Sequence, residues 1–98
     1  MSVTFRKGAF QPGTTQNITT SGTSSASSAF ATSTSIIRVT CTQDIYIQLG
    51  NSPTASATGC MLITAGSSEF LAVDAINNQK IAVIQVSSAG VCSITELA

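Results

Sequence analysis

Charge is scarce in this sequence. Only 8% of its 98 residues are charged, whereas roughly 25% is usual for soluble domains, and the formal net charge is zero. The cations are dispersed and form no basic patch that could follow a phosphate backbone: Arg6, Lys7, Arg38 and Lys80. We therefore expect no nucleic-acid partner. Weak charge repulsion also favours self-association, so this composition suits permanent contact with other subunits.

Histidine and tryptophan are absent, and Tyr46 is the one tyrosine. Without histidine the chain lacks the usual general base of serine and cysteine triads. The carboxylates form no motif, since Asp44 and Asp74 lie in predicted turns, and Glu69 and Glu96 lie at predicted strand ends. The sequence predicts no catalytic residue, no cofactor-binding residue and no cofactor, and we expect that the protein is not an enzyme.

Cysteines are few and widely spaced. Cys41, Cys60 and Cys92 include no C-x-x-C pair, and no histidine is present to complete a zinc site, so we expect no metal site. Cys41 and Cys92 alternate with aliphatic residues, which is typical of small, buried, reduced side chains. A disulfide is the alternative.

Long apolar runs are also missing, because no stretch of about 18 apolar residues occurs. The N-terminus, Met1–Lys7, lacks the basic-then-apolar order of a signal peptide. We expect no membrane partner, and a protein that is made and used without membrane export.

Ser and Thr, which make up roughly a third of the chain, dominate an N-terminal segment at residues 1–34. We interpret this segment as an arm with short strands that belongs to the same domain as the rest. The strands are expected at Val3–Phe5, Gln16–Thr20 and Ala29–Ala31. The run Thr19–Ser28 fits a flexible linker, a loop, or a strand whose side chains are small because a neighbour lies close.

Residues 35–98 show the two-residue period of half-buried strands, with turn residues between them. This pattern predicts a core of three antiparallel hairpins, which pair Ile37–Cys41 with Ile45–Leu49, Cys60–Thr64 with Glu69–Val73, and Gln79–Val86 with Val91–Leu97. The first connection, Gln43 and Asp44, has the length of a tight hairpin turn but lacks the glycine that such turns prefer.

Short strands at regular spacing, without a ten-residue amphipathic helical window, indicate an all-β protein. We predict an antiparallel β-sandwich of the jelly-roll or Greek-key kind. The apolar runs Met61–Ile63 and Ile81–Ile84 fit strands covered on both faces, either within the sandwich or by a neighbouring subunit. Apart from a turn around Ser52–Thr58 or Asp74–Asn78, we expect no helix.

A succession of motifs runs through the last two thirds of the chain. An arginine-bearing aliphatic strand precedes an acidic residue, an aromatic strand and a Pro-Thr-Ala loop, and an apolar hairpin, a Glu-Phe strand and a closing pair of strands follow. The segments are Ile36–Val39, Asp44–Ala55, Met61–Gly66, Ser68–Leu71, Lys80–Gln85, Ser88–Gly90 and Ser93–Leu97. This succession resembles a widespread group of small phage and prophage virion structural proteins. The three cysteines and the Ser/Thr-rich first third depart from that pattern.

The resemblance assigns no functional residue, but it implies a structural role in a bacteriophage particle. We expect a capsid decoration or cement protein, located in the virion after assembly in the host cytoplasm. Its expected partners are the major capsid protein, other virion proteins and further copies of itself, with a trimer as the expected oligomer. The alternatives are a neck, tail or fibre component in low copy number, and a carbohydrate- or receptor-binding module.

Overall fold

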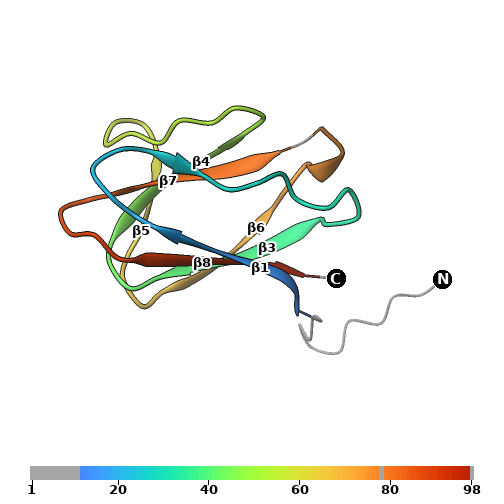
Figure 1. The fold of residues 1–98 in the computed structure, drawn as a ribbon, viewed down its shortest axis with the longest axis horizontal. Coiled ribbons are helices and arrows are strands. Elements are labelled where there is room, and N and C mark those ends of the chain that lie inside the picture. Colours follow the sequence, from blue (N-terminus) through green and yellow to red (C-terminus); the bar gives the residue numbers. More distant parts are fainter. Residues whose placement is uncertain (1–11, 78, 98) are drawn as a thin grey trace.

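The computed structural model describes residues 12–77 and 79–97, which form strands and one short 3-10 helix (Figure 1). In chain order the elements are β1 (Pro12–Thr19), β2 (Ser25–Ala26), β3 (Ile36–Cys41), β4 (Ile45–Gly50), β5 (Met61–Ile63), β6 (Ser68–Ala72), η1 (Ala75–Asn77), β7 (Lys80–Gln85) and β8 (Val91–Leu97). The prediction of an all-β protein is confirmed for these residues.

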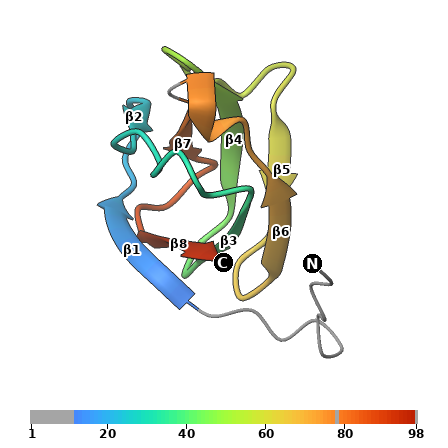
Figure 2. The ribbon, with the colours of Figure 1, turned by 90° about the vertical axis from the view of Figure 1, so that its right-hand side faces the viewer.

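The strands form two antiparallel sheets of four, stacked as two layers (Figure 2). Sheet A has the order β1-β8-β3-β6, and sheet B has the order β2-β7-β4-β5. Each strand of the first half of the chain therefore pairs with its counterpart in the second half: β1 with β8, β2 with β7, β3 with β6, and β4 with β5. Strands β5 and β6 lie at one edge of the molecule, and β1 and β2 lie at the opposite edge (Figure 2).

One hydrophobic core lies between the two sheets. Alternate residues of the central strands point into it, as the two-residue period of a strand requires. Its large, fully buried side chains are Ile37, Val39 and Ile94 from sheet A, and Ile45, Ile63, Ile81 and Val83 from sheet B. Burial of each such side chain contributes about 1.5–3 kcal/mol, so this shared core supports the outer faces of both sheets.

The predicted strand positions after residue 35 agree closely with the observed ones. The turn expected around Asp74–Asn78 is also present, because η1 falls within it. Local alternation of apolar and polar residues was therefore sufficient to locate the strands.

The three predicted hairpins are wrong. Strands β3 and β4 belong to different sheets, and the same is true of β5 and β6 and of β7 and β8. At each of these short connections the chain crosses from one sheet to the other, so that Cys41 and Ile45, for example, enter the core from opposite sides. A lone hairpin leaves its apolar face uncovered, whereas a crossing buries the inner faces of both strands against each other.

The first third of the chain contributes to both sheets. The strand predicted at Gln16–Thr20 is present as part of β1, which begins earlier and pairs with β8. Within the run Thr19–Ser28, β2 pairs with β7, where Ala26 lies opposite Ala82. The close approach of these two small side chains supports the third alternative for that run, a strand beside a near neighbour.

The strand predicted at Ala29–Ala31 is wrong. Phe30 is buried in the core, and the backbone N–H of Ala31 donates to a carboxylate oxygen of Glu96 at 2.9 Å instead of to a strand. A bulky aromatic residue and a side-chain acceptor thus replace the regular ladder at this point. The strand predicted at Val3–Phe5 lies outside the described residues.

The two continuously apolar runs have different surroundings. Ile81, Ala82 and Val83 are all buried, so β7 is covered on both faces within the chain, as predicted. In β5, however, Met61 and Leu62 are 45% and 48% exposed. The edge position of β5 explains the difference, because among the described strands none lies beyond it in sheet B.

Candidate interaction surface

Hydroxyl and amide side chains cover the outer face of sheet A. The strand register aligns them in two rows across the sheet, Thr15, Thr95, Arg38 and Phe70 in one, and Asn17, Ser93, Thr40 and Ser68 in the other. We call this surface the hydroxyl face. Its side chains also bond to one another, since the hydroxyls of Thr15 and Thr95 are 2.9 Å apart and Arg38 donates to Ser68 at 2.8 Å.

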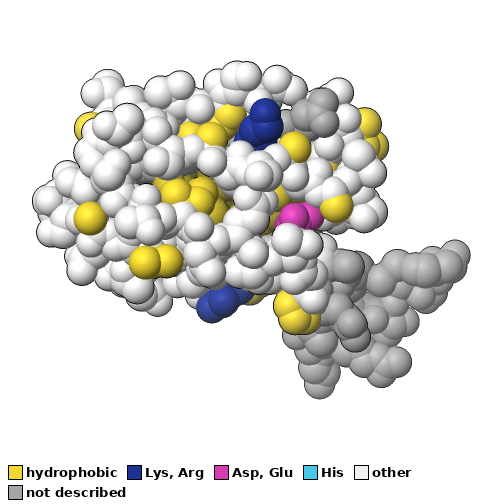
Figure 3. Space-filling model, in the orientation of Figure 1, with side chains coloured by type: hydrophobic (Ala, Val, Ile, Leu, Met, Phe, Trp, Pro, Cys, Tyr) yellow, Lys and Arg dark blue, Asp and Glu magenta, His cyan; other side chains and the backbone are white. Residues whose placement is uncertain are grey.

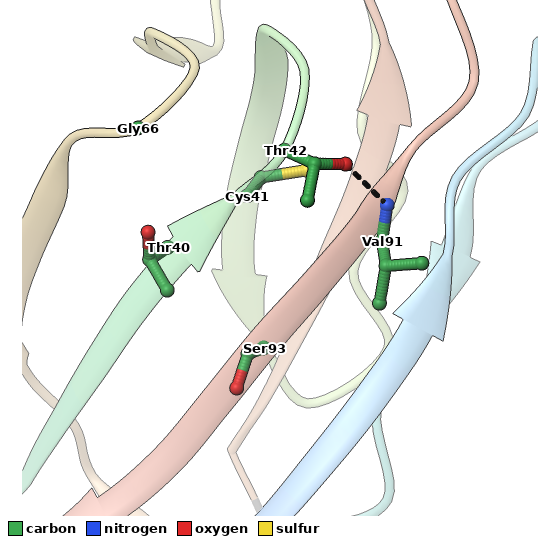
Figure 4. A pocket seen from close by; sticks show the side chains of 6 residues that line it. All are labelled: Thr40, Cys41, Thr42, Gly66, Val91 and Ser93. Carbon is green, nitrogen blue, oxygen red and sulfur yellow. Dashed lines mark hydrogen bonds between the residues drawn. The ribbon is translucent and has the colours of Figure 1, made fainter.

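A groove of about 500 Å³ lies at one end of the hydroxyl face (Figure 4). It is lined by Thr40, Cys41, Thr42, Gly66, Val91 and Ser93. The backbone N–H of Val91 donates to the Thr42 hydroxyl at 3.0 Å, which fixes that side chain across β3 and β8. The lining offers hydroxyl groups that donate and accept hydrogen bonds, and no carboxylate or imidazole. Most of the exposed lining is nevertheless apolar, so the groove suits a group that is largely apolar and has a few hydrogen-bonding atoms.

Apolar side chains lie on the outer face of sheet B. The register places Ile84 beside Tyr46, and Tyr46 beside Leu62, in a line across β7, β4 and β5. We call these three residues the apolar row. Ile84 and Tyr46 are half-buried and Leu62 is exposed, and the row itself carries no charge. Both cross-strand neighbours of Tyr46 are therefore apolar.

The edge formed by β5 and β6 exposes two further apolar side chains, one beside the apolar row and one on the outer face of sheet A. Met61 on β5 is 45% exposed, and Phe70 on β6 is 57% exposed. Both strands end their sheets, so each also presents backbone groups that none of the strands described in residues 12–97 pairs. Large apolar side chains beside open strand edges are typical of surfaces that another protein covers.

Charged groups are sparse on the described surface, and the face in Figure 3 is largely uncharged. The two aspartates serve turns, as predicted: Asp44 accepts the backbone N–H of Ala65 at 2.7 Å, and Asp74 accepts the side-chain amide of Asn77 at 2.6 Å. These bonds hold the connections between strands in place.

Glu96 lies near the end of β8, as predicted, and its side chain points inward. It is only 7% exposed, and its carboxylate accepts bonds from the Ala31 N–H and the Thr34 hydroxyl. It therefore fastens the connection between β2 and β3 to the end of sheet A. The two-residue period of the strand indicates this burial, because Glu96 follows Cys92 and Ile94 at two-residue steps and so points inward with them.

The cysteines are free thiols. Cys41 and Cys92 are buried, as predicted, and they lie opposite each other on β3 and β8. Burial raises the pKa of the Cys92 thiol to about 12, and the neighbouring Cys41 adds to the shift. Cys60 is half-buried beside Gln48, near β5.

Residues 12–77 and 79–97 contain neither a metal-binding cluster of side chains nor a membrane-spanning helix. They hold no group of three or more His, Cys, Asp or Glu side chains that could bind a metal ion. No helix in that part of the chain has the length and hydropathy of a membrane span.

Comparison with known proteins returned no match: no protein family fits the chain, and no curated protein or solved structure shows significant similarity to it.

Proposed function

We propose that this protein is a jelly-roll β-sandwich that serves as a structural component of a bacteriophage particle, as a capsid decoration or cement protein. The strand order supports the fold assignment, because pairing of the first strand with the eighth, the second with the seventh, the third with the sixth and the fourth with the fifth is what an eight-stranded chain rolled up from its middle produces. Jelly rolls are frequent in viral capsid proteins.

The observation that carries the proposal is the apolar row together with the edge beside it. Ile84, Tyr46 and Leu62 form a strip on the outer face of sheet B that ends at the edge strand β5, where Met61 is also exposed. Burial of apolar surface gains about 25 cal/mol per Å², so a partner that covers this strip stabilises the assembly. Decoration of a shell repeats one such contact over many symmetric positions.

The low charge of the chain agrees with this role. A surface that is covered in the assembled particle needs few charges for solubility, and Ser and Thr supply hydrogen bonds without them. The proposed partners are the major capsid protein, other virion proteins and further copies of this chain, and the proposed location is the virion after assembly in the host cytoplasm. Nucleic acid and membrane are not among the proposed partners, and no catalytic role is proposed.

The test is the copy number of this chain per purified particle, measured by quantitative mass spectrometry against the major coat protein. A decoration or cement protein gives a ratio near one, or a simple fraction repeated over the shell. A handful of copies would instead support a neck, tail or fibre component. Absence from the particle would overturn the virion proposal.

The docking face is tested with two matched charge insertions. Leu62→Lys places a charge at the end of the apolar row, and Thr15→Lys places one on the hydroxyl face, both at exposed positions. We expect Leu62→Lys to lower particle occupancy about tenfold or more, because the lysine must be desolvated at the contact. Equal occupancy by the two variants would contradict docking through sheet B.

The arm proposed for the N-terminus is tested separately by deletion of residues 1–11. Deletion of the whole segment 1–34 is unsuitable, because it would also remove β1 and β2 from the sheets. Lower occupancy of the shortened chain, with an unchanged unfolding midpoint, is the expected result. Unchanged occupancy would rule out an arm in these residues.

A second candidate function is a carbohydrate- or receptor-binding module, for which the observation is a groove on sheet A that combines three hydroxyl groups with a mostly apolar lining. Thr40, Thr42 and Ser93 offer the hydrogen-bonding groups that recognise sugar hydroxyls. Binding on a glycan array that is lost in Ser93→Val would support this function. An array without hits would rule out this second function, and the structural role would be the one proposal that remains.

A further inference from the structure

Two thiols face each other inside sheet A. Cys41, near the end of β3, is paired in register with Cys92 of β8. Their side chains are 3% and 0% exposed, so both point into the core between the sheets. The pair lies at neighbouring positions on adjacent strands, although the two residues are far apart in sequence.

The hydrogen-bond pattern shows which kind of cross-strand pair they form. The backbone N–H of Thr42 donates to the carbonyl of Val91 at 3.1 Å, so the position next to the cysteines is the hydrogen-bonded one. The carbonyl of Cys41 itself accepts the N–H of Gly66, on the opposite side of β3. Cys41 and Cys92 therefore occupy a non-hydrogen-bonded pair.

This kind of pair brings its side chains closest. Typical Cα separations are about 4.5 Å in non-hydrogen-bonded pairs and about 5.5 Å in hydrogen-bonded ones. Disulfides span Cα separations of about 4.4–6.8 Å. The two thiols can therefore be joined with little movement of either strand.

We propose that Cys41 and Cys92 form a cross-strand disulfide when the protein meets a small-molecule disulfide such as oxidised glutathione, and that this bond locks β3 to β8. The proposal rests on register and backbone hydrogen bonding, and it holds independently of the particle in which the protein serves.

The two sulfurs have different access to the oxidant. Cys41 borders the groove on sheet A and keeps 3% of its surface exposed, whereas Cys92 has no exposed surface, so an oxidant that enters between the strands reaches Cys41 first. Cys41, as its thiolate, attacks the oxidant, forms a mixed disulfide and releases one small thiolate. The thiolate of Cys92 then attacks the sulfur of Cys41 and releases the second. Two protein thiols are oxidised by two electrons, the oxidant is reduced to two thiols, and the two protons pass to the released thiolates.

The bond closes a long loop of the chain. Strands β4, β5, β6 and β7 all lie between the two cysteines, so the disulfide restricts much of the unfolded chain. For a loop of this kind we expect the unfolding midpoint to rise by about 5–15 °C. Cys60 lies outside the pair and serves as the internal control.

The experiment equilibrates the purified full chain with mixtures of reduced and oxidised glutathione, followed by intact mass, peptide mapping and thermal unfolding. The expected result is the loss of two hydrogen atoms, a linked peptide pair containing Cys41 and Cys92, and the raised midpoint. Cys60→Ser should behave like the wild type, and Cys41→Ser and Cys92→Ser should lose both signals.

Peptide mapping of the wild type keeps the test decisive if a core variant fails to fold. A chain that keeps both thiols reduced in the most oxidising mixture would overturn the proposal. A disulfide that involves Cys60, or a linked pair without a rise in the midpoint, would overturn the lock between β3 and β8.

Discussion

The two outer faces of this molecule share one framework and carry opposite chemistry. The hydroxyl face of sheet A presents groups that water satisfies, such as Thr15 and Asn17, whereas sheet B presents Ile84, Tyr46 and Leu62. Covering the apolar row gains free energy from burial alone. Covering the hydroxyl face gains only if the partner replaces the hydrogen bonds of water. The two faces therefore differ in what a partner must supply: buried apolar area for sheet B and matching hydrogen bonds for sheet A.

The inner sides of the two sheets also differ in the chemistry of their side chains. Sheet A points Cys41, Cys92 and Glu96 inward, while the inward residues of sheet B include the aliphatic Ile45 and Val83. Groups that titrate or react are thus concentrated in sheet A, and sheet B depends on packing. Substitutions in each layer can test this division.

The largest effect on the free energy of unfolding is expected in the hydrophobic core, which supports the outer faces of both sheets. Ile94→Ala removes a fully buried side chain of the shared core and should lower the free energy of unfolding by about 2–5 kcal/mol. Urea denaturation measures the loss. Ser93→Ala, one residue away on the hydroxyl face, is the control and should change stability by less than about 1 kcal/mol. Similar losses for the two variants would contradict the assignment of inner and outer sides.

The next effect concerns only the inner side of sheet A. Cys92 has its pKa raised from 9.0 to about 12, so the folded chain keeps this proton where the unfolded chain loses it. Stability from this group is therefore complete below pH 9 and falls as the pH rises towards 12, by about 1.4 kcal/mol for each pH unit. Urea midpoints across this range should show the slope in Cys60→Ala and lack it in Cys92→Ala. An equal slope in both variants would assign the alkaline loss to other groups.

A smaller effect is expected at the corner between β7 and β8. A Cβ added at Gly90 would lie 2.6 Å from the Thr42 hydroxyl and 2.9 Å from Cγ of Gln43. Gly90→Ala should displace Thr42 from its bond with the Val91 N–H and cost about 1–3 kcal/mol. Gly22→Ala is the matched control, because nothing lies within 4 Å of a Cβ there. A loss confined to Gly90→Ala, seen in thermal unfolding, would show that this corner shapes the groove of sheet A.

For residues 35–98 the sequence was sufficient to locate the strands but not to pair them. Alternation is a local property, and β3, β4 and β8 all show it. A short polar connection between two such strands serves a hairpin and a crossing between sheets equally well. The missing glycine at Gln43 and Asp44 was the one local sign against a hairpin, since tight hairpin turns favour residues with positive φ.

The candidate surface was predictable only in part. The apolar runs of β5 and β7 look alike in sequence, yet β7 is covered and β5 is exposed, because sheet order decides which strand is an edge. The hydroxyl face likewise depends on register, which brings Thr40 beside Ser93. The inward position of Glu96, by contrast, follows from the period of its own strand.

The smallest effect on stability is expected from substitutions that make the outer face of sheet B more polar or the outer face of sheet A more apolar. These substitutions also test directly which face associates. Leu62→Ser shortens the apolar row at an exposed position, so we expect a stability change within about 0.5 kcal/mol. Self-association at high concentration, measured by analytical ultracentrifugation, should fall. The double variant Thr40→Val and Ser93→Val gives the hydroxyl face an apolar pair and should raise it. Opposite shifts would show that side-chain chemistry decides which sheet associates. If self-association neither falls in Leu62→Ser nor rises in the double variant, it depends instead on the open edges of β5 and β6. Both variants leave the backbone groups of those edges unchanged.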